Sequence, residues 1–248
     1  MNEVRTLARQ TAVYGLGTIV PRFLNYAIVA IFYTWFFTKA EYGILTELYA
    51  WMVFLLIVLT YGMETGFFRF SQNSKDYERV YSTTLISLLV TSAAFLIFVN
   101  IFIGPVSAVL KYSDNPGYIR MFAAIVAMDA FTAIPFARLR RENRALLFSA
   151  IKIANVLIII VSVVFFLLVA PGIYEKSHGW FRKIYDPGYG VGYVFLANLI
   201  GSAATLLILL PFVILKKPVF DRELWKRMMA YSVPLLITGL SGSVNDTL

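Results

Sequence analysis

The sequence predicts an all-α bundle of helices that cross a membrane several times. Its 248 residues are 59% hydrophobic and 15% charged, whereas an ordinary soluble domain has about 45–50% apolar and about 25% charged residues. The mean hydropathy is +0.73. The apolar residues gather in runs of about 20, the length that a helix needs to cross a hydrocarbon core of about 30 Å. Lipid is therefore the expected solvent for most of the chain.

Six complete spans and the beginning of a seventh are predicted from these runs. The complete spans are residues 14–36, 45–68, 83–103, 119–136, 146–169 and 193–215. We expect residues 1–227 to form one six-helix transmembrane lobe, and residues 228–248 to begin the seventh span and a second lobe. The last residues, LSGSVNDTL, carry no polar tail. This favours a chain that continues in a longer protein.

The first span is expected to remain in the mature protein. The basic segment MNEVRTLARQ precedes it and superficially resembles a signal peptide. The apolar run that follows is much longer than the hydrophobic region of about 7–15 residues in a signal peptide. We therefore interpret it as an uncleaved span.

The distribution of basic residues predicts the orientation of the chain. With the N-terminus inside, fifteen of the 22 Lys and Arg residues fall on the inner side, including Arg140 and Lys152, and six fall on the outer side. Short cytoplasmic loops carry the excess of Lys and Arg. The sequence thus predicts a multi-pass membrane protein with a cytoplasmic N-terminus. Topology also explains the net charge of +8, so no nucleic-acid partner is expected.

The composition disfavours several kinds of chemistry. There is no Cys, and His178 is the one His of the chain. A Cys-ligated zinc site, a thiol nucleophile, a histidine metal cluster and a Ser/His triad are therefore disfavoured. The sequence also lacks a Gly-rich phosphate loop and an HExxH motif. We expect no catalytic residue, no metal and no cofactor.

Arg22 lies inside the predicted first span, about 12 Å from its inner end at 1.5 Å per residue. Thr18, Asn25 and Tyr26 stand at the i−4, i+3 and i+4 positions, so they share a helix face with Arg22. A helix surface that contacts only lipid is not expected to carry such a polar stripe. Ionisable groups inside spans usually face a bundle interior or a wet cavity. These four residues are the candidate substrate-binding wall.

Two carboxylates are predicted to lie in the same half of the membrane. Glu64 is about 7 Å, and Asp129 about 12 Å, from the inner ends of their spans. Arg69 falls at the edge of the second span and is explained by topology. Arg22 is the candidate partner for Glu64 or Asp129. Two interpretations stay open, a structural ion pair or a cavity in which carboxylates position Arg22 or couple transport to an ion.

Four segments resemble a known family. TAVYGLGTIVPRFLNY (11–26), KAEYGILTELYAW (39–51) and TYGMETGFFRF (60–70) are similar to the first two spans of bacterial polysaccharide-biosynthesis flippases. YSVPLLITGLSGSVNDTL at the end of the chain resembles the start of their seventh span. These O-antigen and capsule repeat-unit exporters belong to the multidrug/oligosaccharidyl-lipid/polysaccharide exporter superfamily. The resemblance covers the whole chain in topology and about a third of it in motifs.

The resemblance implies two six-helix lobes that face a central cavity and work by alternating access. It implies that the cavity receives the pyrophosphate of a polyprenyl-linked oligosaccharide, with Arg22 and Asn25 on its wall. The implied partners are this lipid-linked oligosaccharide, membrane lipids and a coupling cation, H⁺ or Na⁺, with polysaccharide-assembly proteins as further candidates. Two alternatives stay open. One is a multidrug extruder of the same superfamily, in which acidic residues would be favoured over a central Arg, and the other is a polytopic polysaccharide-modifying enzyme.

Overall fold

The computed structural model describes residues 15, 19–21, 23, 24, 32–72, 77–176, 179–214 and 218–247. Every regular element in these residues is a helix. In chain order they are α2 (Thr34–Phe36), α3 (Lys39–Thr60), α4 (Met63–Phe70), α5 (Tyr77–Ile101), α6 (Ile103–Val109), α7 (Pro116–Arg141), α8 (Ala145–Val164), a π-helical turn (Phe165–Val169), α9 (Ala170–Lys176), α10 (Phe181–Ile184), a 3₁₀ turn (Pro187–Tyr189), α11 (Gly192–Val213) and α12 (Arg222–Thr247).

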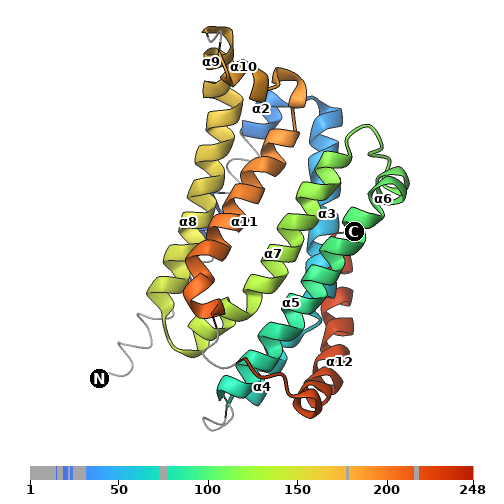
Figure 1. Ribbon diagram of the computed structural model, residues 1–248, viewed down its shortest axis with the longest axis vertical. Coiled ribbons are helices and arrows are strands. Elements are labelled where there is room, and N and C mark those ends of the chain that lie inside the picture. The colour runs from blue at the N-terminus through green and yellow to red at the C-terminus, as the bar shows by residue number, and fades with distance from the viewer. Residues whose placement is uncertain are drawn as a thin grey trace.

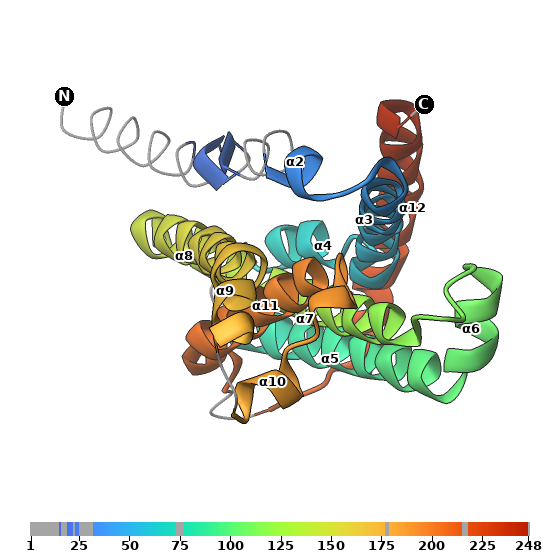
Figure 2. The same ribbon diagram turned by 90° about the horizontal axis from the view of Figure 1, so that it is seen from above.

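The long helices run side by side as a bundle (Figure 1). Viewed from above, α7 lies near the middle of the bundle, with α5 and α11 beside it and α3 and α8 further out (Figure 2). At the lower end in Figure 1, α4 and α7 end and α5, α8 and α12 begin. We call this the basic end, because Arg138, Arg140, Arg141 and Arg144 lie there. The short helices α9 and α10 lie at the opposite end.

The all-α polytopic fold predicted from the sequence is confirmed. Five helices of the described part are long and apolar enough to cross a membrane, namely Lys39–Phe70, Tyr77–Ile101, Pro116–Arg141, Ala145–Lys176 and Gly192–Val213. They correspond to the second through sixth predicted spans. Most of the first predicted span lies outside the described residues. The chain is a multi-pass membrane protein.

Most helices extend beyond the apolar runs that predicted them. Helix α5 begins at Tyr77 rather than near residue 83, and α12 begins at Arg222 rather than near Met228. The added turns are polar, and hydropathy alone cannot assign them to a helix. Asp221 explains the start of α12, because its carboxylate accepts hydrogen bonds from the backbone N–H groups of Glu223 and Leu224 at 3.0 and 3.1 Å.

The second span is not one continuous helix. It starts with a capping box, in which the Thr38 hydroxyl and the Glu41 carboxylate each accept a hydrogen bond from the other's backbone N–H. It is interrupted at Tyr61 and Gly62, which have left-handed φ values of 35° and 70°. Glycine adopts this conformation without strain. The interruption separates α4 from α3 and allows α4 to take its own direction.

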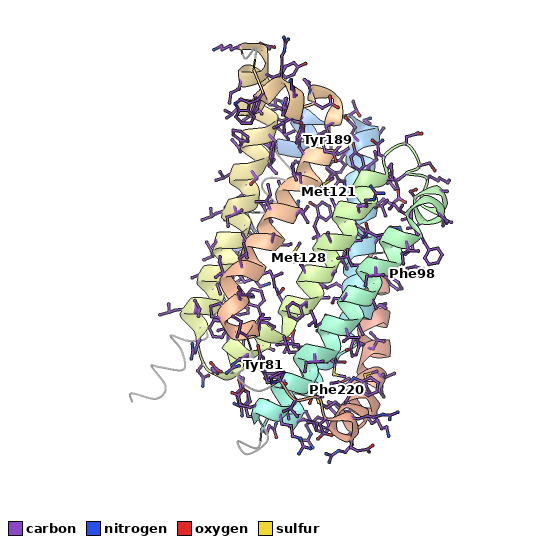
Figure 3. All side chains as sticks on the ribbon, in the orientation of Figure 1. Tyr81, Phe98, Met121, Met128, Tyr189 and Phe220 are labelled. Atoms are coloured by element: carbon purple, nitrogen blue, oxygen red, sulfur yellow. The ribbon has the colours of Figure 1, made fainter. Side chains whose placement is uncertain are left out.

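Helix α7 provides the centre of the core. Its buried face includes Ile119, Phe122, Val126 and Ala130, which belong to one hydrophobic cluster with residues of α3 and α11. A second cluster near the basic end joins α4, α5 and α7 to Leu224 and Met228 of α12. Figure 3 shows Tyr81 and Phe220 near that end and Tyr189 near the other. The apolar core thus fixes α7 against its neighbouring helices. The polar groups described next come from α7 and from these neighbours.

Candidate functional site

A polar cavity of about 420 Å³ lies between α3, α4, α7, α8 and α11. Four ionisable side chains line it, two carboxylates and two cations, and they come from three helices. They are Glu64 of α4, Asp129 and Arg140 of α7, and Lys152 of α8. The rest of the lining is Leu56, Ile57, Thr60, Thr132, Ala133, Phe136, Phe148, Asn155 and Thr205. The cavity is thus polar within helices that are otherwise apolar.

Glu64 forms an ion pair with Arg140. The two side chains are 38% and 35% exposed, so the pair opens onto the cavity rather than being enclosed. The Arg140 guanidinium also lies over the rings of Phe68 and Phe148, 5.3 and 5.7 Å from the ring centroids. Contacts of this kind with an aromatic face hold a cation in place without neutralising it. Arg140 is therefore a positioned cation at the edge of the cavity.

Asp129 and Lys152 carry the other two charges of the cavity. The Asp129 carboxylate interacts with the Lys152 ammonium and makes a side-chain hydrogen bond with Ser202 of α11. Lys152 Nζ lies 4.1 Å from the centroid of the Phe136 ring. Lys152 also interacts electrostatically with Arg140 and Glu64. The four charges therefore act on one another as a single group.

Uncharged polar side chains complete the wall. Asn155 donates to the Thr205 hydroxyl over 2.9 Å, which joins α8 to α11. The Thr132 hydroxyl donates to the backbone carbonyl of Asp129 at 3.1 Å. Thr60 similarly bonds back to the carbonyl of Leu56 at 2.8 Å. Such groups can hydrogen-bond water or a polar ligand while the helices stay intact.

The structure places the sequence-predicted residues as follows. Glu64 and Asp129 line the same cavity. Thr18, Arg22, Asn25 and Tyr26 lie outside the described residues, so their roles stay predictions. Arg69 is exposed on α4 and does not line the cavity. Glu64 has a partner from another span, Arg140, and its expected pairing with Arg22 stays a prediction.

Arg140 and Lys152 are the functional candidates that the sequence analysis missed. Both were assigned to the cytoplasmic excess of basic residues. Lys152 also lies well inside α8 and contributes to the cavity wall, a role that this assignment did not predict. Its place six residues inside the predicted fifth span was the available signal, because a cation within a span usually faces a polar interior. Arg140 offered no such signal at the end of its helix.

A second charged cluster lies at the basic end, outside the cavity. Glu142 accepts hydrogen bonds from Arg138 Nε at 2.7 Å and the Tyr77 hydroxyl at 3.0 Å, and its other oxygen pairs with Arg144 at 2.9 Å. Burial alone raises the pKa of the Glu142 carboxyl, but these hydrogen bonds and positive charges outweigh burial and hold its pKa below the usual value. The cluster joins the start of α5 to the turn after α7.

An ion-paired polar cavity inside an apolar multi-helix bundle is the arrangement of a membrane transporter. The family comparison agrees. The chain matches the family described as "Polysaccharide biosynthesis protein" over residues 7–248, and it belongs to that family. This match confirms the resemblance found in the sequence and defines a polysaccharide-related membrane transporter. No curated protein and no solved structure matches the chain.

Proposed function

We propose that this chain is the N-terminal lobe of a flippase for lipid-linked oligosaccharides. Its substrate would be a polyprenyl-pyrophosphate-linked repeat unit, moved across the bacterial inner membrane by alternating access for surface polysaccharide biosynthesis. The observation that carries the proposal is the pair of cations, Arg140 and Lys152, on the wall of one cavity between membrane-spanning helices. Membership in the polysaccharide biosynthesis family supports the class of substrate.

The chemistry of the substrate matches this wall. A pyrophosphate and a glycan cannot cross hydrocarbon unaided, so a carrier must offer them a wet cavity with positive charge. Arg140 suits a phosphate because its planar guanidinium can donate two parallel hydrogen bonds and keeps its charge. Lys152 adds a compact positive charge. Asn155, Thr132 and Thr205 supply hydrogen-bonding groups near both cations.

The ion pairs suggest how the substrate is taken up and released. A pair as exposed as Glu64 and Arg140 contributes about 0–1 kcal/mol, whereas a hydrogen bond to a charged group contributes about 1.5–3 kcal/mol. A phosphate can therefore replace Glu64 on Arg140 at little cost. A proton or Na⁺ taken up by Glu64 or Asp129 would neutralise the displaced carboxylate. Transport would then be coupled to a cation gradient.

The same proposal includes the residues predicted from the sequence alone. Arg22, with Thr18, Asn25 and Tyr26 on its helix face, would add a third cation and more polar groups to the wall. The basic end of the bundle would face the cytoplasm, as the excess of Lys and Arg predicts. Membrane lipids would surround the bundle, and polysaccharide-assembly proteins are candidate partners downstream.

The alternative of a multidrug extruder finds less support in the cavity. A site for organic cations is expected to carry excess negative charge, but among the described lining residues two cations balance two carboxylates. A polysaccharide-modifying enzyme would need a nucleophile or an acid/base group poised at a substrate site. Glu64 is instead ion-paired with Arg140, and Asp129 interacts electrostatically with Lys152. We therefore propose transport rather than catalysis.

The proposal can be tested by complementation of a flippase-deficient strain with the full-length gene. Arg140→Gln and Arg22→Ala are expected to lower polysaccharide export, and Arg140→Lys to restore part of it. Arg69→Gln is the matched control, because Arg69 is an exposed cation of α4 that does not line the cavity. Normal export by Arg140→Gln at an equal protein level would contradict the role given to this cation. Drug resistance without export would favour the extruder.

A further inference from the structure

Helix α4 is a short unit that can change direction relative to the rest of its span. It contains eight residues, Met63–Phe70, and it follows the left-handed pair Tyr61 and Gly62. A break of this kind in a span leaves a few backbone angles that can absorb a reorientation of the following helix. The connection of α4 to α3 is therefore a candidate hinge.

One face of α4 packs directly against α12, the helix that contains the start of the predicted seventh span. A Cβ added at Gly66 would lie 2.5 Å from the Ser232 hydroxyl oxygen, and one added at Gly62 would lie 2.7 Å from the Ser232 carbonyl oxygen. Ser232 belongs to α12 and is completely buried. Small residues allow two helices to approach closely. Gly62, directly before α4, and Gly66 both lie against Ser232, and a side chain at either position would force a neighbouring atom to shift.

The other face of α4 carries the cavity carboxylate. Glu64 is two residues before Gly66, which places it about 200° around the helix from that glycine. It pairs with Arg140 of α7. The same eight-residue helix thus contacts the seventh span on one side and the cavity cation on the other. Helix α4 therefore provides one route by which movement of either contact reaches the other.

We propose that Gly62, Gly66 and Ser232 are positioning residues that fix α4 to the seventh span, so that displacement of this span opens or closes the Glu64–Arg140 ion pair. The inference rests on the proposed transport function, in which one lobe moves against the other. The hinge at Tyr61 and Gly62 lets α4 follow α12 while α3 stays packed on α7. The partly exposed Glu64–Arg140 ion pair is the contact that yields, while Met63 and Phe67 stay buried in the core.

The two glycines offer a matched pair of substitutions. In Gly66→Ala the new methyl group meets the Ser232 hydroxyl, and Ser232→Ala removes that oxygen and leaves the Ser232 Cβ at an ordinary 3.9 Å. In Gly62→Ala the methyl group meets the backbone of Ser232, which no substitution of Ser232 removes, and the φ of +70° is unfavourable for alanine. Ser232→Ala should therefore rescue one glycine variant and not the other.

Ser232→Ala alone is expected to be harmless. Its hydroxyl is buried and makes no hydrogen bond within the described residues. Removing a buried hydroxyl that has no partner is close to neutral for stability. The rescue can therefore be attributed to relief of the contact with Gly66.

The experiment uses a cysteine at Ala133 as the reporter in the full-length protein. Ala133 lines the cavity on α7, and the 248 residues contain no native Cys. The rate at which a membrane-impermeant maleimide labels Ala133→Cys measures how often the cavity is open. The same protein without Ala133→Cys provides the blank. Thermal stability of each variant in detergent is measured in parallel.

We expect Gly66→Ala to change the labelling rate by at least about fivefold, the lower end of usual coupling effects. Gly66→Ala with Ser232→Ala should return to the wild-type rate, and Gly62→Ala should not be rescued by Ser232→Ala. Wild-type labelling of Gly66→Ala would overturn the inference. So would a double variant that regains stability but not the labelling rate, because the contact would then be merely structural.

The readout does not involve a polysaccharide. If the full-length protein fails to move lipid-linked oligosaccharide but the Gly66 and Ser232 pattern holds, the proposed substrate is wrong and the coupling through α4 stands. If transport occurs and the pattern is absent, the coupling is wrong and the proposed function stands.

Discussion

Replacing Lys152 with Met should destabilise the protein, and a second substitution should reverse much of this effect. Lys152→Met keeps the length of the side chain but removes the positive charge that faces Asp129. It also removes the cation from the Phe136 ring, 4.1 Å from Nζ. Asp129 would then keep its hydrogen bond with Ser202 but lose its opposite charge. The variant therefore isolates the value of the charge pair.

The size of the effect follows from burial. Removing one partner of a fully buried ion pair costs about 3–5 kcal/mol. Asp129 and Lys152 are only partly buried and open onto the cavity, so we expect Lys152→Met to cost about 1–3 kcal/mol, between the values for exposed and buried pairs. Asp129→Asn with Lys152→Met should recover to within about 1 kcal/mol of wild type, because neither charge is then left alone.

The assay is unfolding in mixed detergent micelles, followed by circular dichroism, for wild type, both single variants and the double variant. Lys226→Met is the control, because Lys226 pairs with Glu223 at 2.9 Å on an exposed surface and should change stability by less than about 0.5 kcal/mol. A double variant whose loss equals the sum of the two single losses would refute the coupling of Asp129 to Lys152.

Two further predictions concern the basic end. Asp221→Ala should destabilise the protein, because α12 loses its N-terminal cap, and Asp221→Asn should restore most of the lost stability in the same unfolding assay. The pKa of Glu142 lies below its usual value, so this residue stabilises the fold above the ordinary Glu pKa of about 4.3, and the contribution is lost as pH falls through the lower folded-state pKa. Thermal stability measured between neutral and strongly acidic pH should fall less steeply in Glu142→Gln, and equal slopes would contradict this assignment.

The sequence was sufficient for the architecture because a membrane leaves few choices. Each backbone polar group must be bonded within its own segment in hydrocarbon, so an apolar run of about 20 residues becomes a helix. The predicted spans from 45–68 to 193–215 correspond to observed helices for this reason. The division into two lobes remains a prediction.

The break between α3 and α4 could not be predicted from hydropathy. Tyr61 and Gly62 lie inside an apolar run, and the run remains apolar whether its helix is continuous or interrupted. Gly62 was the available signal, since glycine is common where φ is positive. The structural role of Gly62 depends on the close approach of Ser232, which lies 170 positions later in the chain.

The candidate site was only partly predictable for a related reason. Glu64 and Asp129 were predicted as site residues because an ionisable group inside a membrane span is energetically costly. Both line the cavity. Their partners depend on which helices are neighbours and how each is rotated, which periodicity within one helix does not give. The pairing of Glu64 with Arg140 was therefore not predicted, and its pairing with Arg22 remains a prediction. Lys152 was overlooked because it lies close in sequence to a basic loop and was counted with it.

The most direct test of the central claim is translocation by the purified full-length protein in vesicles. The substrate is a polyprenyl-pyrophosphate oligosaccharide, and its appearance on the opposite leaflet is measured against empty vesicles. We predict translocation by wild type and Arg69→Gln, and a rate lower by about tenfold to a hundredfold for Arg140→Gln, because a charge-assisted hydrogen bond contributes about 1.5–3 kcal/mol and 1.4 kcal/mol is tenfold. No translocation above empty vesicles, or an unchanged rate in Arg140→Gln, would contradict the account.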